Sequence, residues 1–211
     1  MWYARACDTT ISKTLSSIAG QQARTTEGLQ EELSGSWIMY CSTHPDSTIR
    51  FLASDMFLAL HLDGSHLSET GSKSRTAGQF YLTNKDDKDT NNGAVLALSK
   101  IINHVMEIES LFYNCKDAIP LRLALEEMGH PQPKTTTVTD SSTAEGLINK
   151  TMTPNRAKTY DFTTNWLKCR EAQRQFDIMW KKGKDNRADY HSKDHPPHVH
   201  KGGEYLYEPM S

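Results

Sequence analysis

Residues 56–65 read MFLALHLDGS, an apolar run that ends in an aspartate followed by a glycine. The run is typical of a strand buried in a sheet, and the sequence predicts a strand over residues 51–63. A carboxylate at the end of a buried strand is costly to desolvate unless it is paired or holds a cation. Asp63 therefore indicates a functional site, and a turn residue is the alternative for this aspartate taken alone.

Two further aspartates occur in a similar context. Asp140 ends the extended run TTTVTD at residues 135–140, and Asp189 follows the run FDIMW at residues 176–180. Several converging carboxylates attract a hard, oxygen-loving ion such as Mg²⁺. Together the three aspartates predict a carboxylate-lined metal site on an α/β scaffold. For each of them alone, a turn or a helix cap remains the alternative.

Hydrophobic periodicity and turn residues predict the remaining elements. The expected order is three strands in an antiparallel meander, a helix, a fourth strand, two helices and a fifth strand. We expect Pro120 to break the first helix near Ile119, and Ser142 or Thr143 to cap the second. After the first strand, the predicted ranges are strands at 74–83, 93–105, 135–140 and 175–181 and helices at 107–128, 141–150 and 159–174. The result is a mixed sheet with helices packed on it.

The chain of 211 residues suits one domain with an appendage. Helical spacing predicts helix over residues 7–43, and the Pro-, His- and Gly-rich tail after Asp194 is expected to be loosely ordered. No stretch reaches the roughly 20 apolar residues of a membrane span, and residues 1–6 lack a signal-peptide pattern. Four widely spaced cysteines suggest free thiols in a reducing compartment. We therefore expect a protein that is not secreted and has no membrane partner.

The net charge of -2 hides an uneven distribution. Residues 146–193 hold eleven Lys and Arg against five Asp and Glu. Basic side chains around an acidic centre suit a polyanionic substrate whose phosphate needs a metal; a solvated basic helix face is the alternative. The candidate nucleic-acid-binding residues are Lys158, Lys181, Lys182, Lys184, Arg187 and Lys193.

Several short stretches, in this order and spacing, cover nearly the whole chain. They are YARA (3–6), IAGQQ (18–22), YCSTHPD (40–46), SDM (54–56), LDGSHLSE (62–69), RTAG (75–78), LEEMGHPQP (125–133), TDSSTA (139–144) and ADYHSK (188–193). No single stretch is specific, but the series resembles the ribonuclease H domain of copia-type LTR-retrotransposon polyproteins. The resemblance implies an α/β ribonuclease H-like fold, a mixed five-stranded sheet with flanking helices preceded by a helical connection segment.

The resemblance also implies a division of the chain and an activity. Residues 1–50 would be the end of the reverse transcriptase connection, residues 51–195 the ribonuclease H-like domain and residues 196–211 a flexible tail. The activity would be hydrolysis of the RNA strand of RNA–DNA hybrids with Mg²⁺, for which Mn²⁺ can substitute. The partners would be the hybrid and the reverse transcriptase portion of the same polyprotein, in a cytoplasmic retrotransposon particle or the nucleus. Carried over by motif, the metal-binding and catalytic residues would be Asp63, Glu107, Asp140 and Asp189.

One departure from the family pattern lies just before Glu107. The family carries a Ser-Ser-x-x-Glu-Ala-Glu-like stretch there, and about six residues of it are missing. The shorter loop leaves Glu109 as an alternative to Glu107. It also leaves a second hypothesis, a catalytically inactive remnant that keeps the fold and only binds nucleic acid.

Two other residue groups have weaker functional interpretations. His191, His195, His198 and His200 form no firm zinc motif. Trp166 and Trp180 are interpreted as core residues, with stacking on bases as the alternative.

Overall fold

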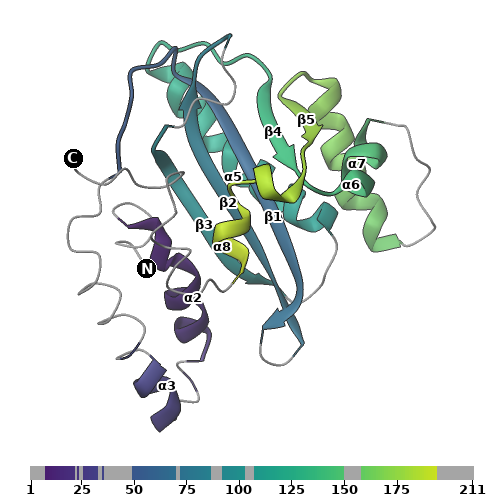
Figure 1. The fold of residues 1–211 in the computed structure, drawn as a ribbon. Coiled ribbons are helices and arrows are strands. Elements are labelled where there is room, and N and C mark those ends of the chain that lie inside the picture. The colour runs from purple at the N-terminus through teal and green to yellow at the C-terminus, as the bar shows by residue number, and fades with distance from the viewer. Residues whose placement is uncertain are drawn as a thin grey trace.

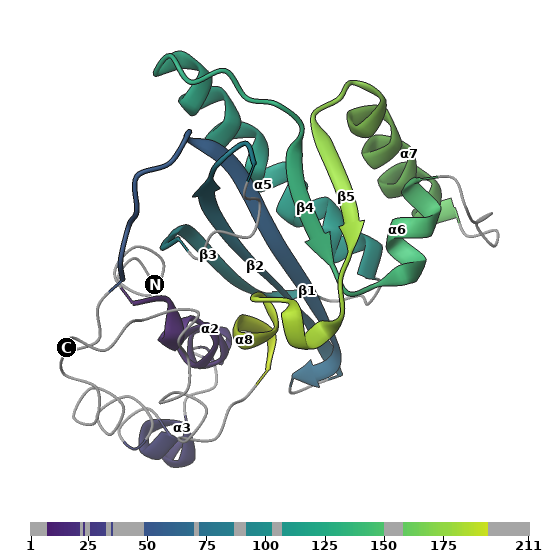
Figure 2. The same ribbon diagram turned by 45° about the horizontal axis from the view of Figure 1, so that its top comes forward.

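The computed structural model describes residues 8–21, 23, 26–32, 35, 49–69, 72–86, 92–102, 107–149 and 158–193. Its centre is a five-stranded sheet with helices on both faces (Figure 1). The helices α5, α6 and α7 lie on one face, and the short helices α2 and α8 lie on the other (Figure 2). No helix in the described ranges is both long and apolar enough to cross a membrane.

The strand order is β3-β2-β1-β4-β5. The strands β2 and β3 continue from β1 as an antiparallel meander. The strand β4 pairs parallel to β1, and β5 pairs parallel to β4. The predicted mixed five-stranded sheet with flanking helices is therefore confirmed. The strands are β1 (Phe57–Glu69), β2 (Lys73–Thr83), β3 (Ala94–Ile102), β4 (Thr135–Thr139) and β5 (Phe176–Trp180).

The first strand is shifted relative to the prediction. It begins at Phe57 rather than at residue 51 and continues six residues past Asp63 to Glu69. The reason is its hairpin with β2, in which Gly64 pairs with Thr76 and Ser65 with Arg75. Asp63 consequently lies inside a strand, between two residues that are held in the ladder.

The helical elements are η1 (Thr9–Ile11), α2 (Ser12–Gly20), α3 (Glu27–Glu32), α5 (Glu107–Glu127), α6 (Ser142–Ile148), α7 (Lys158–Ala172), η4 (Gly183–Asp185) and α8 (Asp189–Ser192). Of the helix predicted over residues 7–43, the described residues form η1, α2 and α3, with Gln21 in a turn after α2; residues 7, 22, 24–25, 33–34 and 36–43 lie outside the described residues. The cap of α6 is Ser141, whose hydroxyl accepts a hydrogen bond from the Ala144 amide at 3.1 Å, and not Ser142 or Thr143 as predicted.

The expected break near Ile119 is wrong, because α5 runs through Pro120 without interruption. Proline removes the hydrogen bond to the carbonyl four residues earlier. Both Pro120 and Lys116 are on the solvent side of the helix, so water can solvate that carbonyl. Burial of the inner side of α5 outweighs the loss. The helix ends at Glu127, close to the predicted end at residue 128, and Gly129 just beyond it adopts a left-handed φ of 91°.

Alternation along β1 divides its side chains between two different layers. Leu58, Leu60 and Leu62 face α5, α6 and α7 and form the apolar core with Ile108, Leu111, Leu147, Leu167, Phe176 and Ile178. Trp166 packs against this core, whereas Trp180 is 47% exposed. The opposite face carries polar side chains that α2 and α8 cover, including His61, Asp63, Arg75, Gln79 and Ser99, all buried. The candidate site belongs to this polar face.

Gly78 on β2 is a position where packing forbids a side chain. A Cβ there would lie 1.8 Å from Asn114 Oδ1, and the Asn114 amide is fixed by hydrogen bonds to Thr76, Ala77 and Ser110. We expect Gly78→Ala to destabilise the fold by about 2 kcal/mol through overpacking, measured by urea unfolding. Gly28→Ala in α3, whose Cβ would meet nothing closer than 4.0 Å, is the control. Equal stability of Gly78→Ala and the parent would contradict this packing.

Candidate metal centre

Three of the predicted site residues come together. Asp63 lies in β1, Asp140 directly follows the neighbouring parallel strand β4, and Asp189 begins α8, which packs against β1 and β2. One carboxylate oxygen of each lies within 4.8 Å of the others. The convergence expected from the strand order is thus present in the structure.

Asp63 is the most deeply buried of the three, at 3% exposure. Burial, together with the charges of Asp140 and Asp189, raises its pKa to about 6. The hydroxyl of Ser192 opposes this by donating a hydrogen bond to Asp63 Oδ2. Burial, and with it the charge of Glu107, also raises the pKa of Asp140. Ionising these carboxyl groups in the folded protein therefore costs free energy, and a bound divalent cation would lower that cost.

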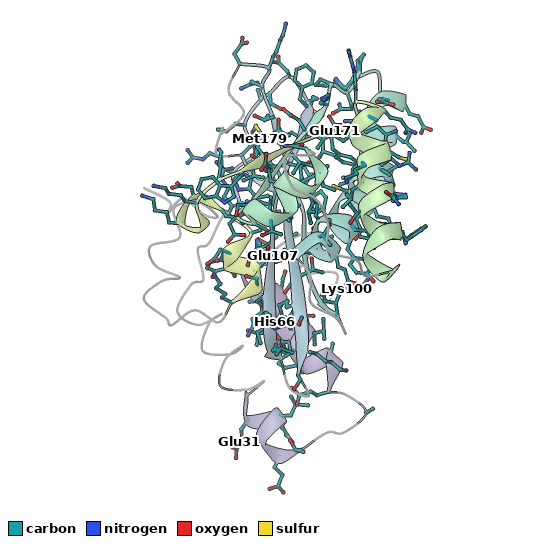
Figure 3. All side chains as sticks on the ribbon, turned by 90° about the vertical axis from the view of Figure 1, so that its right-hand side faces the viewer. Glu31, His66, Lys100, Glu107, Glu171 and Met179 are labelled. Atoms are coloured by element: carbon teal, nitrogen blue, oxygen red, sulfur yellow. The ribbon has the colours of Figure 1, made fainter. Side chains whose placement is uncertain are left out.

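Glu107 adjoins this cluster from another element. It is the first residue of α5 and is labelled in Figure 3. The hydroxyl of Ser141 donates a hydrogen bond to Glu107 Oε2. Burial, and then the charge of Asp63, raises the pKa of Glu107. Glu107 is outside the group whose oxygens lie within 4.8 Å, but the charge of Asp63 raises the pKa of Glu107, and the charge of Glu107 raises the pKa of Asp140.

The segment leading to Asp189 is anchored to β1. The side-chain amide of Asn186 donates a hydrogen bond to the Leu62 carbonyl at 2.8 Å, one residue before Asp63. The Arg187 amide donates to His61 Nδ1 at 3.1 Å, and its guanidinium lies over the Tyr81 ring, 4.9 Å from the ring centroid. These contacts hold the start of α8 beside Asp63.

The predicted nucleic-acid-binding residues occupy different places. Lys181, Lys182 and Lys184 follow β5 in the segment around Gly183, where an added Cβ would lie 3.3 Å from Asp140 Oδ2. Lys193 forms an ion pair with Asp189. Arg187 lies against the sheet, and Lys158 begins α7. Four of the six basic residues thus flank the acidic cluster: Lys181, Lys182, Lys184 and Lys193.

Sequence reasoning missed two hydroxyl groups of the site. Ser192 contacts Asp63, and Ser141 contacts Glu107 while capping α6. The sequence contains no signal for the Ser192 contact, because the two partners are 129 residues apart. Of the tail histidines, His191 is buried in α8; His195, His198 and His200 lie outside the described residues.

No protein-family model matches the chain, and no curated protein is detectably similar in sequence. Several solved structures are similar at low identity. LC11-RNase H1 in complex with RNA/DNA hybrid is 13% identical with a TM-score of 0.47, over 63% of this chain and 91% of that one. The N-terminal RNase H domain of rv2228c from Mycobacterium tuberculosis is 14% identical with a TM-score of 0.42, over 64% and 87%. Prototype foamy virus protease–reverse transcriptase is 15% identical with a TM-score of 0.41, over 61% of this chain and 18% of that one.

The order of strands and helices defines a ribonuclease H-like fold. An antiparallel three-stranded meander is followed by a long helix, a parallel fourth strand, further helices and a parallel fifth strand. The acidic cluster lies on the central strand of this sheet, at the end of its parallel neighbour and at the start of α8. Its donor set, carboxylate oxygens alone, fits the ligand preference of Mg²⁺ and Mn²⁺.

Proposed function

We propose that this protein hydrolyses the RNA strand of RNA–DNA hybrids in a reaction that depends on Mg²⁺, with Mn²⁺ able to substitute. The observation that carries the proposal is the convergence of Asp63, Asp140 and Asp189, with Glu107 beside them, on a ribonuclease H-like sheet. When bound, divalent ions supply electrostatic stabilisation at the phosphate and lower the pKa of a water molecule. Asp63 and Asp140 are the central ligands in this proposal.

The protein's own residues hold the site and attract the substrate. Ser192 fixes one oxygen of Asp63, and Ser141 fixes Glu107 at the start of α5, where it can orient the substrate strand. Asp189 completes the ligand set. Lys181, Lys182 and Lys184 pass beside Asp140 and supply positive charge for the phosphate backbone of a hybrid.

We further propose a copia-type retrotransposon origin, supported by the ordered series of short stretches along the chain. In this proposal residues 1–50 are the end of a reverse transcriptase connection, residues 51–195 the ribonuclease H-like domain and residues 196–211 the tail. The reverse transcriptase portion of the same polyprotein is then a partner. The place of action would be a cytoplasmic particle or the nucleus.

A second candidate function is binding of nucleic acid without turnover. It is favoured by the short connection before Glu107, since β3 ends at Ile102 and α5 begins at Glu107. Metal ligands need placement within about 0.5 Å for catalysis. A connection shortened in this way can leave the fold intact while misplacing one carboxylate.

Cleavage of a labelled RNA–DNA hybrid in Mg²⁺ or Mn²⁺, with Asp140→Asn as the control, separates the two candidates. Cleavage by the parent and not by Asp140→Asn supports the ribonuclease. A folded parent that binds the hybrid but leaves it intact supports the inactive remnant. Equal cleavage by both proteins would overturn the assignment of the site.

The contact between Ser141 and Glu107 gives a sharper prediction. We expect Ser141→Ala to lower the cleavage rate about tenfold, as is typical when a partner that orients a metal ligand is lost. Ser141→Thr keeps the hydroxyl and should recover most of the rate. Ser142→Ala, the same change one residue later on the exposed side of α6, is the matched control. Equal rates for both alanine variants would show that Glu107 needs no support from Ser141.

A further inference from the structure

A fully buried arginine lies on the polar face of the sheet. Arg75 on β2 is 0% exposed, and its Nε lies 2.7 Å from Glu69 Oε1 on β1. Its two terminal nitrogens each donate a hydrogen bond at 2.8 Å, one to Ser99 on β3 and one to Ser17 on α2. A buried guanidinium is tolerated only when its donors are satisfied. Two of these partners belong to the sheet, and the third comes from the N-terminal helix.

Ser17 connects to both members of the buried ion pair. Its hydroxyl accepts from Arg75 and donates to Glu69 Oε2 at 3.1 Å. The two contacts use both the donor and the acceptor capacity of one hydroxyl. The helix α2 packs on β3 beside them, with Gly20 close to the Ile101 side chain. The N-terminal helix thus supplies hydrogen bonds to Arg75 and Glu69 that come from outside the sheet.

The network continues from Ser99 into α8. The Ser99 hydroxyl donates to the His191 carbonyl at 2.7 Å, and the next residue, Ser192, contacts Asp63. Ser65 on β1 donates to the Ser192 carbonyl at 3.2 Å. A continuous series of contacts therefore runs from Ser17 through Arg75 and Ser99 to the helix that carries Asp189.

The helix α8 depends on such contacts for its position. It has four residues, from Asp189 to Ser192, and its N-cap residue, Ala188, makes no side-chain cap hydrogen bond. Helix formation is costly to initiate, so a single turn is not stable by itself. The strands β1, β2 and β3 contact α8, and so do η1 and α2. Its place is set by these neighbours.

We infer that α2 is a positioning element of the acidic centre, acting through Ser17 and Arg75 on α8. Ser17 is a positioning residue in this scheme, since it touches neither substrate nor metal ligands. The link to metal binding rests on the proposed function, whereas the link between α2 and α8 does not. Residues 9–20 then belong to the domain that carries the acidic centre and do not serve only as a linker to it.

Hydrogen exchange of the metal-free full chain tests the link between α2 and α8. The amides to follow are His191 and Lys193, which bond to Ala188 and Asp189. We expect Ser17→Ala to speed their exchange about fivefold, the effect of losing one hydrogen bond. Ser16→Ala, the same change one residue away in α2, should leave it within about twofold, and Ser17→Thr should restore protection. Equal exchange in the two alanine variants would overturn the inference.

Calorimetric titration with Mn²⁺ tests the consequence for the site. Ser17→Ala should bind Mn²⁺ about fivefold more weakly than Ser16→Ala at a temperature where both are fully folded. Unchanged affinity together with a lower melting temperature would show that α2 is structural only, and would overturn the positioning role. If the parent itself binds no Mn²⁺ while the exchange result holds, the metal centre fails and the coupling of α2 to α8 stands.

Discussion

Replacing Asp63 with asparagine is expected to reduce hybrid cleavage about a thousandfold or more. Asp63 is the central carboxylate of the cluster, and bound ions at such a site contribute several kcal/mol to the reaction. Asparagine keeps the size of the side chain and an oxygen that can accept the Ser192 hydrogen bond. The variant therefore removes the charge while leaving the fold in place. The measurement is the initial rate of RNA cleavage at saturating Mg²⁺.

The matched control for this experiment is Asp117→Asn. Asp117 lies on α5, ten residues beyond Glu107 and outside the acidic group. It should retain the parent rate. An Asp63→Asn protein that cleaves as fast as Asp117→Asn would show that the cluster is not the reacting centre.

The Asp63→Asn substitution should also stabilise the metal-free protein at neutral and alkaline pH. The pKa of Asp63 is raised from 3.8 to about 6, chiefly by burial. The folded state therefore binds a proton more tightly than the unfolded chain does. Since a shift of one unit corresponds to 1.36 kcal/mol, ionised Asp63 costs about 3 kcal/mol of folding stability at high pH. Asp63→Asn removes this cost.

The pH window follows from the direction of the shift. Below pH 3.8 the carboxyl is protonated in both states and contributes nothing. Between pH 3.8 and about 6 the unfolded chain ionises first, so the stability of the parent falls as pH rises. Above about pH 6 the loss is complete and constant. The raised pKa values of Glu107 and Asp140 act in the same direction.

Chemical denaturation in a chelating buffer at several pH values measures this effect. The stability difference between Asp63→Asn and the parent should be small near pH 4 and reach its full size by pH 8. Adding Mg²⁺ at pH 8 should stabilise the parent and not the variant, because only the parent has all three ionised carboxylates to bind the ion. A difference of the same size at both pH values would contradict the raised pKa.

The sequence predicts those parts of the fold that local patterns encode. The apolar run before Asp63 and the extended run before Asp140 identify two buried strands, and the parallel pairing of β1 with β4 brings their aspartates together. The strand order therefore makes the acidic cluster predictable from residues far apart in the chain. The start of β1 was misplaced because the hairpin with β2, and not the apolar run, sets its limits.

Contacts between distant polar groups could not be predicted. The hydroxyls of Ser192 and Ser141 have no periodic pattern around them, and their partners are known only once the sheet is assembled. The continuity of α5 through Pro120 depends on which side of the helix faces solvent, which tertiary packing decides. The burial of Arg75 likewise depends on α2, a helix that lies outside the predicted domain.

The wide separation of the three aspartates along the chain has a consequence for synthesis. Asp63 comes from the first strand, Asp140 from the residue after the fourth strand, and Asp189 from the last described helix. A nascent chain that ends before α8 contains all five strands but only two of the three carboxylates. In the proposed enzyme, incomplete translation products would therefore carry no complete metal centre. Nuclease activity would arise only when translation has passed residue 189.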